Sequence, residues 1–156
     1  CRVSNLKNIS FTDKIKISNN CLKEDLYNLV FNMFHHGRFL EDLNLNYERS
    51  SHRNQKWAID LLKSNCEGKF LYKKEKLIGF MFYEATEKII ELKLGGVVSK
   101  YQHVAPQFWS YILSCFDNGK SIKTNISAAN LGVLNLYNHF GFKVTECLVG
   151  YHKTNV

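Results

Sequence analysis

The sequence is poor in several features that would assign it to a class at once. It contains a single proline, Pro106, and no apolar run close to the roughly 20 residues that a membrane-spanning helix requires. The longest such run, residues 77–83, is far shorter, and no charged segment followed by an apolar one opens the chain as a secretion signal would. These absences predict a soluble protein with no membrane partner.

The cysteines favour neither disulfide bonds nor a zinc site. There are five, an odd number, and no two of them form a Cys-x-x-Cys pair. A disulfide framework needs paired cysteines, and structural zinc sites usually use that short spacing. We therefore predict a reducing, cytoplasmic location and no bound metal. Because the first residue is Cys1 and not Met, we also expect the sequence to be part of a longer chain.

Positive charge exceeds negative charge, but it is not concentrated in one segment. The formal net charge is +7, and the cluster at residues 73–76 contains an acid among its lysines. A nucleic-acid surface normally needs a basic stripe on one face. The composition therefore favours solubility and the attraction of small anionic ligands over binding of nucleic acid.

Hydrophobic periodicity predicts two helices near the N-terminus. In the first, residues recur with the spacing of one helix face, and Asn19 or Asn20 is placed to cap its start. The second is predicted to begin near Ser50 or Ser51 and shows the same spacing. The two faces consist of Leu22, Leu26, Leu29, Val30 and Met33, and of Ala58, Leu61, Leu62 and Asn65.

From Gly68 onwards the spacing changes to the two-residue period of strands. Residues 70–72, 77–83 and 89–98 are predicted as three successive strands with short connections, which indicates an antiparallel meander. A helix follows with Pro106 in its first turn, where a missing N–H costs the helix nothing. The next elements are a strand over 122–127, a helix over 130–140 that Gly141 ends, and a last strand over 142–153.

The complete order is ααβββαβαβ. With 45% hydrophobic residues, the 156-residue chain has enough apolar side chains for one core, so we expect a single domain over residues 1–156. The expected fold class is α/β (α+β), with a mixed central sheet and helices on both faces.

This order and one sequence block resemble the GNAT-type N-acetyltransferases. Residues 130–142 begin with Asn130, contain Leu136-Tyr137 and end with Gly141-Phe142, which is similar to the second conserved block of that family. A narrower similarity joins residues 38–42 and Trp57 to acetyltransferases of nucleotide-linked amino sugars, the dTDP-4-amino-4,6-dideoxyhexoses. The resemblance implies a GNAT-like fold and acetyl-CoA as cosubstrate.

The resemblance also implies roles for Asn130 and Tyr137. The two residues are seven apart, so they lie on nearly the same face of the predicted helix. In the family this helix lies beside the pantetheine arm, and the tyrosine protonates the departing CoA thiolate. A phenol suits that role because it stays a neutral donor until about pH 10. The alternative is that Tyr137 is only a core aromatic, packed with neighbours at helical spacing.

Two adjacent glycines, Gly95 and Gly96, interrupt the last strand of the meander. Glycine weakens a strand and often marks a bulge or a close approach of another backbone. In GNAT folds this strand splays from its neighbour, and its free backbone groups bind pantetheine and polarise the thioester carbonyl. The resemblance thus implies that the N–H groups of Val97 and Val98 bind cofactor and oxyanion. A purely structural bulge is the alternative.

The connection that follows is predicted to hold the cofactor's pyrophosphate. Strand-to-helix connections bind phosphates because unpaired N–H groups and the helix dipole point at the ligand. The family pattern has Gln or Arg, two residues, Gly, one residue, and Gly or Ala. This chain has no glycine there, and Pro106 lacks an N–H. The candidate cofactor-binding residues of this connection are Gln102, His103, Val104, Ala105 and Gln107.

The narrower resemblance implies residues on the acceptor side. Arg38, Phe39 and Asp42 are the candidate substrate-binding residues, because a guanidinium group binds phosphate oxygens in pairs. A surface pair of Arg38 with Asp42 is the alternative. The pair His35-His36 suggests a metal or general-base site. Adjacent helical residues point to different sides, however, so a cation near a helix C-terminus fits the pair better than a shared metal.

The leading hypothesis is an N-acetyltransferase that moves acetyl from acetyl-CoA to a primary amine of a nucleotide-linked amino sugar. The amine would attack the thioester directly in a ternary complex, with Val97 and Val98 at the oxyanion and Tyr137 as the acid. One alternative is a non-catalytic binding module of GNAT fold, which the glycine-free connection favours. Another is an acetyltransferase of protein or peptide amines. A homodimer is left open.

Overall fold

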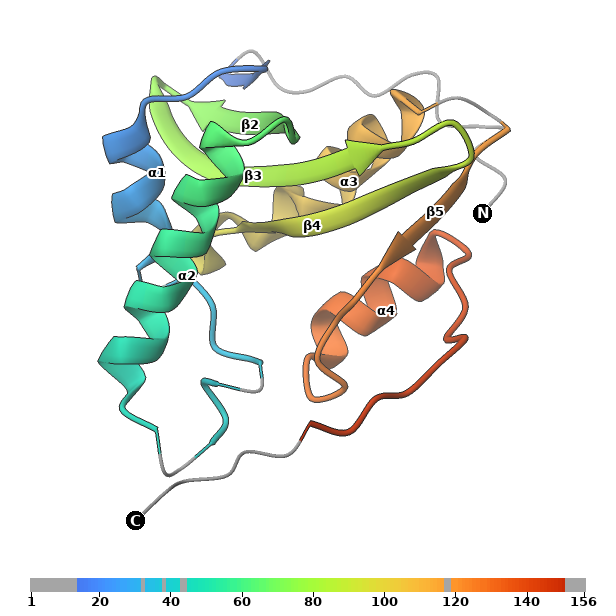
Figure 1. Ribbon diagram of the computed structural model, residues 1–156. Coiled ribbons are helices and arrows are strands. Elements are labelled where there is room, and N and C mark those ends of the chain that lie inside the picture. Colours follow the sequence, from blue (N-terminus) through green and yellow to red (C-terminus); the bar gives the residue numbers. More distant parts are fainter. Residues whose placement is uncertain (1–13, 32, 38, 43–44, 117–118, 151–156) are drawn as a thin grey trace.

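The computed structural model describes residues 14–31, 33–37, 39–42, 45–116 and 119–150. These residues form one sheet with helices on either side of it (Figure 1). The strands are β1 (Ile15–Ser18), β2 (Glu67–Lys73), β3 (Lys76–Ala85), β4 (Ile89–Val97) and β5 (Ser121–Thr124). The α-helices are α1 (Lys23–Val30), α2 (Tyr47–Lys63), α3 (Ala105–Ser114) and α4 (Leu131–His139). Among the described helices, none combines the length and the apolar content needed to cross a membrane.

The sheet is mixed, as predicted. Its strands lie in the order β1-β2-β3-β4-β5. The first four strands pair antiparallel, and β5 pairs parallel to β4. The antiparallel meander of β2, β3 and β4 confirms the prediction from the two-residue period.

Helices cover both faces because β3 is apolar on both faces. Ile78 and Met81 belong to the core that packs against α3 and α4. Phe80 and Phe82 belong to a second core, which packs against α1 and α2. Successive side chains of a strand point to opposite faces, so a strand that is buried along most of its length requires a helix layer on each side.

Local signals fix where α2, α3 and α4 begin. The Asn46 side chain accepts a hydrogen bond from the N–H of Arg49 at 3.1 Å, so α2 begins earlier than predicted. The Asn130 side chain accepts one from the N–H of Val133 at 3.2 Å and caps α4. Pro106 lies in the first turn of α3, as predicted.

Two predictions near the N-terminus were wrong. The four-residue strand β1 was not predicted, because so short a segment shows no clear period. The N-cap residue of α1 is Leu22, without a side-chain hydrogen bond, and neither Asn19 nor Asn20 occupies that position. The side chain of Asn19 instead accepts a hydrogen bond from Lys69 Nζ at 2.7 Å, so a contact with β2 outweighs local capping.

The predicted last strand does not form in its described part. Residues 142–150 contain no strand, and residues 151–153 lie outside the described residues. Val144, Leu148 and Val149 are 72%, 79% and 72% exposed. The segment has the apolar and β-branched residues that strands favour, but a strand also needs a hydrogen-bonded neighbour, which composition alone does not supply.

Candidate functional site

β4 and the edge strand β5 separate part-way along β4. They pair over Ile89–Leu92 and Ser121–Thr124, and the ladder ends with the pair Leu92 and Thr124. Beyond this point β4 continues to Val97, whereas β5 ends and the chain enters the connection to α4 (Figure 1). The split exposes one edge of the last part of β4.

A bulge lies at the start of the split. In the ladder between β3 and β4, Tyr83 faces Leu92 and Phe82 faces Leu94, so Lys93 is the extra residue. An extra residue bends its strand and increases the local twist. The bulge therefore lies where β4 leaves β5, and not at the two glycines where the sequence suggested one.

Gly95 and Gly96 are positions of close approach. A Cβ atom at Gly95 would lie 2.7 Å from Met81 Cε and 2.8 Å from the carbonyl oxygen of Phe80. A Cβ atom at Gly96 would lie 2.8 Å from Met33 Cε. The connection between α1 and α2, which contains Met33, therefore packs directly on β4 beside the split.

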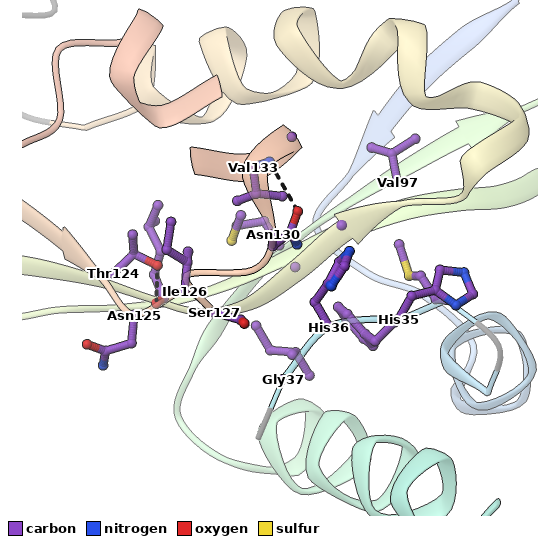
Figure 2. A pocket seen from close by; sticks show the side chains of 18 of the residues that line it. His35, His36, Gly37, Val97, Thr124, Asn125, Ile126, Ser127, Asn130 and Val133 are labelled. Carbon is purple, nitrogen blue, oxygen red and sulfur yellow. Dashed lines mark hydrogen bonds between the residues drawn. The ribbon is translucent and has the colours of Figure 1, made fainter. Parts of the chain in front are cut away.

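The split opens into a cavity of about 840 Å³. Its walls come from the last part of β4, the start of α3, the connection from β5 to α4, the connection from α1 to α2, and α2 itself (Figure 2). Pockets for small molecules and cofactors typically have several hundred cubic ångströms, so this cavity is of the size that such ligands need. The wall residues discussed below are His36, Phe39, Arg53, Trp57, Lys93, Val97, Gln102, Ala105, Ser127, Asn130 and Tyr137.

The backbone of β4 turns Val97, rather than Val98, toward the split. The N–H of Val98 donates a hydrogen bond to the carbonyl oxygen of Ile78 at 2.9 Å, so this group is already paired with β3. Along an antiparallel strand, backbone groups alternate between the two neighbours. The N–H of Val97 therefore points away from β3, to the side where β5 has ended. Of the two predicted donors, only Val97 directs its N–H to the split.

Tyr137 is both a core residue and a wall of the cavity. It is 5% exposed, and its ring packs against Trp109 and Phe142 at centroid distances of 6.4 and 4.8 Å. Burial raises the pKa of its phenol, although Trp109 and Thr124 beside it act in the opposite direction. A raised pKa keeps the phenol protonated at neutral pH, as a proton donor must be. The two interpretations of Tyr137 are therefore compatible.

The connection predicted to hold pyrophosphate is folded as a 3-10 helix over Ser99–Val104. The N–H of Ala105 donates to the carbonyl of Gln102, and Pro106 has no N–H. Fewer backbone donors are therefore left for a phosphate than in an open glycine-rich loop. Of the predicted residues, Gln102 and Ala105 line the cavity, Val104 is buried in the core, and His103 and Gln107 are exposed outside the cavity.

The part of the cavity wall from α2 and the connection before it carries aromatic rings and a guanidinium group. Arg53 Cζ lies 4.0 Å from the centroid of the Phe39 ring and 6.0 Å from that of Trp57. Of the predicted substrate residues, Phe39 lines the cavity, Asp42 does not, and Arg38 lies outside the described residues. Arg53 was missed, although its position four residues before Trp57 puts both on one face of α2.

The described part of the cavity wall carries positive charge without a carboxylate. Arg53 and Lys93 line it, and no Asp or Glu is among its described residues. Lys93 Nζ lies 3.1 Å from Glu84 and 2.8 Å from Glu91, so much of its charge is neutralised. Elsewhere too, the described residues hold no group of three His, Cys, Asp or Glu side chains placed to bind a metal.

The exposed carboxylate of Glu41 contacts three residues of the cavity wall. Its Oε1 is 3.1 Å from His36 Nδ1, and its Oε2 accepts hydrogen bonds from the N–H of Gly37 at 3.2 Å and the hydroxyl of Ser127 at 3.1 Å. The hydrogen bond from His36, followed by those from Gly37 and Ser127, lowers the pKa of the Glu41 carboxyl. Because α1 already ends at Val30, the prediction of a histidine cation at a helix C-terminus was wrong.

Comparison with known proteins addresses the fold. Neither a family model nor a curated protein sequence matches the chain. Solved structures do match it. The PaiA N-acetyltransferase of Thermoplasma acidophilum, in complex with coenzyme A, superposes with a TM-score of 0.65 at 13% identity, covering 85% of this chain and 92% of that one.

Two further matches are acetyltransferases that are named for different acceptors. An aminoglycoside acetyltransferase from an uncultured soil metagenomic sample, in complex with sisomicin, gives a TM-score of 0.57 at 12% identity, over 92% of this chain and 98% of that one. A ribosomal-protein-alanine N-acetyltransferase of Brucella melitensis biovar Abortus 2308 gives 0.58 at 9% identity, over 89% and 99%. The chain has the fold of GNAT acetyltransferases. This confirms the predicted fold class.

Proposed function

We propose that the protein transfers an acetyl group from acetyl-CoA to a primary amine of a nucleotide-linked amino sugar. The observation that carries this proposal is the split between β4 and β5. It places the unpaired edge of β4 at Val97 and the phenol of Tyr137 in the walls of one cavity. The first group is a donor for a developing oxyanion, and the second is a protonated acid for a leaving thiolate.

The residues of the cavity fit a cosubstrate of this kind. Beyond Leu92 the edge of β4 is not paired with β5, so an extended amide-containing arm can form hydrogen bonds along it. Asn130 lines the same wall and caps α4. At the entrance to α3, Gln102 and Ala105 are the residues available to the pyrophosphate. We assign cofactor binding to these residues.

The reaction follows from this placement. The amine nitrogen attacks the thioester carbonyl within a ternary complex, and its carbon–nitrogen bond forms as the carbon–sulfur bond breaks. The N–H of Val97 stabilises the negative oxygen, and the Tyr137 phenol gives its proton to the sulfur. No covalent intermediate with the protein is needed.

The acceptor end of the cavity favours an anionic, planar acceptor over a polycation. Arg53 stacked on Phe39 and near Trp57 offers ring faces and a guanidinium group, which suit a base and its phosphates. An aminoglycoside carries several ammonium groups, and the described wall has no carboxylate to bind them. This distribution of charge supports the nucleotide-linked sugar.

The folding of residues 99–104 favours one rival, a binding module of GNAT fold without catalysis. The 3-10 helix engages the N–H of Ala105, and Pro106 removes a second donor, so binding of pyrophosphate could be weaker. An acceptor panel separates these functions.

The panel contains a dTDP-linked 4-amino-4,6-dideoxyhexose, the aminoglycoside sisomicin and a short peptide with a free N-terminal amine. Release of CoA is followed by chromatography, because the exposed Cys115 and Cys147 would react with thiol dyes. We expect the sugar nucleotide to be acetylated with the highest kcat/KM, and Arg53→Gln to raise its KM. Preference for sisomicin or the peptide would contradict the assigned acceptor, and no turnover with any amine would favour the binding module.

A further inference from the structure

The connection between α1 and α2 is fastened across the cavity to the connection between β5 and α4. Glu41 makes this link, because one carboxylate oxygen bonds to His36 and the other to Ser127, which is 86 residues away in the sequence. Ser127 is itself held in place, since its Oγ accepts a hydrogen bond from the N–H of Ala129 at 3.3 Å. His36 and Ser127 both line the cavity (Figure 2).

Glu41 determines which nitrogen of His36 carries the proton when the ring is neutral. A glutamate carboxyl is ionised at neutral pH even at its ordinary pKa of 4.5, and the pKa of Glu41 is lowered further, so this carboxylate only accepts hydrogen bonds. Nδ1 of His36 must therefore hold the proton that faces Glu41, which leaves Nε2 with a free lone pair. A base oriented by a carboxylate through its other nitrogen is a recurring catalytic arrangement.

His36 lies on the part of the wall that touches β4 beside the split. Three residues before it, Met33 lies against Gly96. A Cβ atom at Gly96 would also lie 3.7 Å from the ring edge of Phe34. In Figure 2 the rings of His35 and His36 point in different directions, and that of His36 is on the side of Val97 and Asn130. His36 therefore lines the same cavity as the groups of the proposed reaction.

We propose that His36 is the general base of the reaction and that Glu41 is its positioning residue. This inference rests on the proposed acetyl transfer, which as derived above has no group to deprotonate the amine. A sugar amine is largely an ammonium ion at neutral pH and has no lone pair for attack until it loses a proton. Nε2 of His36 takes that proton and later releases it to water.

The proton balance of the step is complete with these groups. After the first proton has moved to His36, the nitrogen lone pair forms the bond to the carbonyl carbon, and the electron pair of the carbon–sulfur bond leaves with sulfur. Tyr137 protonates the sulfur and is reprotonated from water. The second proton of the nitrogen passes to water as the amide forms. The other titratable side chains that line the described cavity are His35, Arg53 and Lys93.

The test compares the wild-type chain with His36→Gln, using acetyl-CoA and the dTDP-linked 4-amino-4,6-dideoxyhexose from neutral to alkaline pH. We expect His36→Gln to lower kcat/KM about 100-fold or more at neutral pH. The loss should shrink to within about tenfold at alkaline pH, where the amine is already deprotonated in solution. Added imidazole should restore activity to His36→Gly. The matched control is His139→Gln, because His139 lies on α4 outside the cavity and should leave kcat/KM unchanged.

Glu41 is tested by a double-mutant cycle. If it acts only through His36, Glu41→Gln should lower kcat/KM in the wild-type background and have no further effect in His36→Gln, whereas a purely structural role would add its loss in both. Calorimetric titration with acetyl-CoA shows that each variant still folds and binds. If the wild type is active and His36→Gln is equally active, or loses the same factor of kcat/KM at every pH, His36 is not the general base. The proposed function still stands in that case. A wild-type chain that binds acetyl-CoA but acetylates no amine overturns both.

Discussion

Replacing the two glycines of β4 one at a time separates a backbone constraint from a side-chain contact. In Gly95→Ala the new methyl group would lie 2.8 Å from the carbonyl oxygen of Phe80, which is fixed in the ladder, and 2.7 Å from Met81. In Gly96→Ala it would meet the terminal methyl of Met33 at 2.8 Å, with the next atoms 3.7 Å away. A flexible side-chain end can move aside, whereas a ladder carbonyl cannot.

These contacts give different expected stabilities. Overpacking of a well-packed interior costs about 1–3 kcal/mol, which we expect for Gly95→Ala. For Gly96→Ala the contact with Met33 is largely offset by the gain of about 0.4–1 kcal/mol from the stiffer unfolded chain, so its net effect should stay within about 1 kcal/mol. For a chain of this length, the loss at Gly95 corresponds to a decrease in Tm of roughly 2–12 °C.

Urea unfolding measures both variants, with tryptophan fluorescence as the signal from Trp57 and Trp109. The free energy of unfolding of Gly96→Ala should be close to that of the wild type, and that of Gly95→Ala should be lower than both. If Gly95→Ala is as stable as the wild type, or if both variants lose the same amount, the close approach at β4 is not the reason for the glycines.

Three other predictions follow from single side chains. Tyr137→Phe removes only the hydroxyl and should lower kcat about 100-fold or more while acetyl-CoA still binds; full turnover in the acetylation assay would remove its role as acid. Burial raises the pKa of the Cys21 thiol to about 12, so an aromatic disulfide reagent should label the exposed Cys115 and Cys147 before Cys21 at neutral pH. The order of labelling is measured by mass spectrometry of peptides, and earlier labelling of Cys21 would contradict the prediction. The pKa of Glu41 is lowered on folding, so its contribution to stability is complete above the ordinary value of 4.5 and is lost as the pH falls through the lowered one. Below pH 4.5 the free energy of unfolding should therefore decrease less steeply in Glu41→Gln than in the wild type. The same pH dependence in both proteins would contradict the bonds of Glu41 to His36 and Ser127.

The central part of the fold could be predicted from the sequence because its signals are local. The apolar run over residues 77–83 and the alternation over residues 89–98 give the meander, and Asn130 and Pro106 mark the starts of α4 and α3. The last strand was predicted by the same reasoning and does not form in residues 142–150, because pairing depends on a neighbour that is remote in sequence.

Only those residues of the candidate site that belong to a recognisable local sequence pattern could be predicted. Tyr137 and Phe39 line the cavity as expected. The choice between Val97 and Val98 depends on the phase of the ladder with β3, which spacing does not reveal. The bond between Glu41 and Ser127 joins two connections far apart in the sequence, so no local pattern could indicate it.

The most direct test of the central claim is calorimetric titration of the wild-type chain with acetyl-CoA at moderate salt. The claim is that the split between β4 and β5 is a binding site for this thioester, despite the 3-10 helix and Pro106 at its entrance. We predict micromolar binding with one molecule per chain. The absence of detectable binding would contradict the account, because Val97, Tyr137 and His36 would then line a cavity without the donor substrate on which their proposed roles depend.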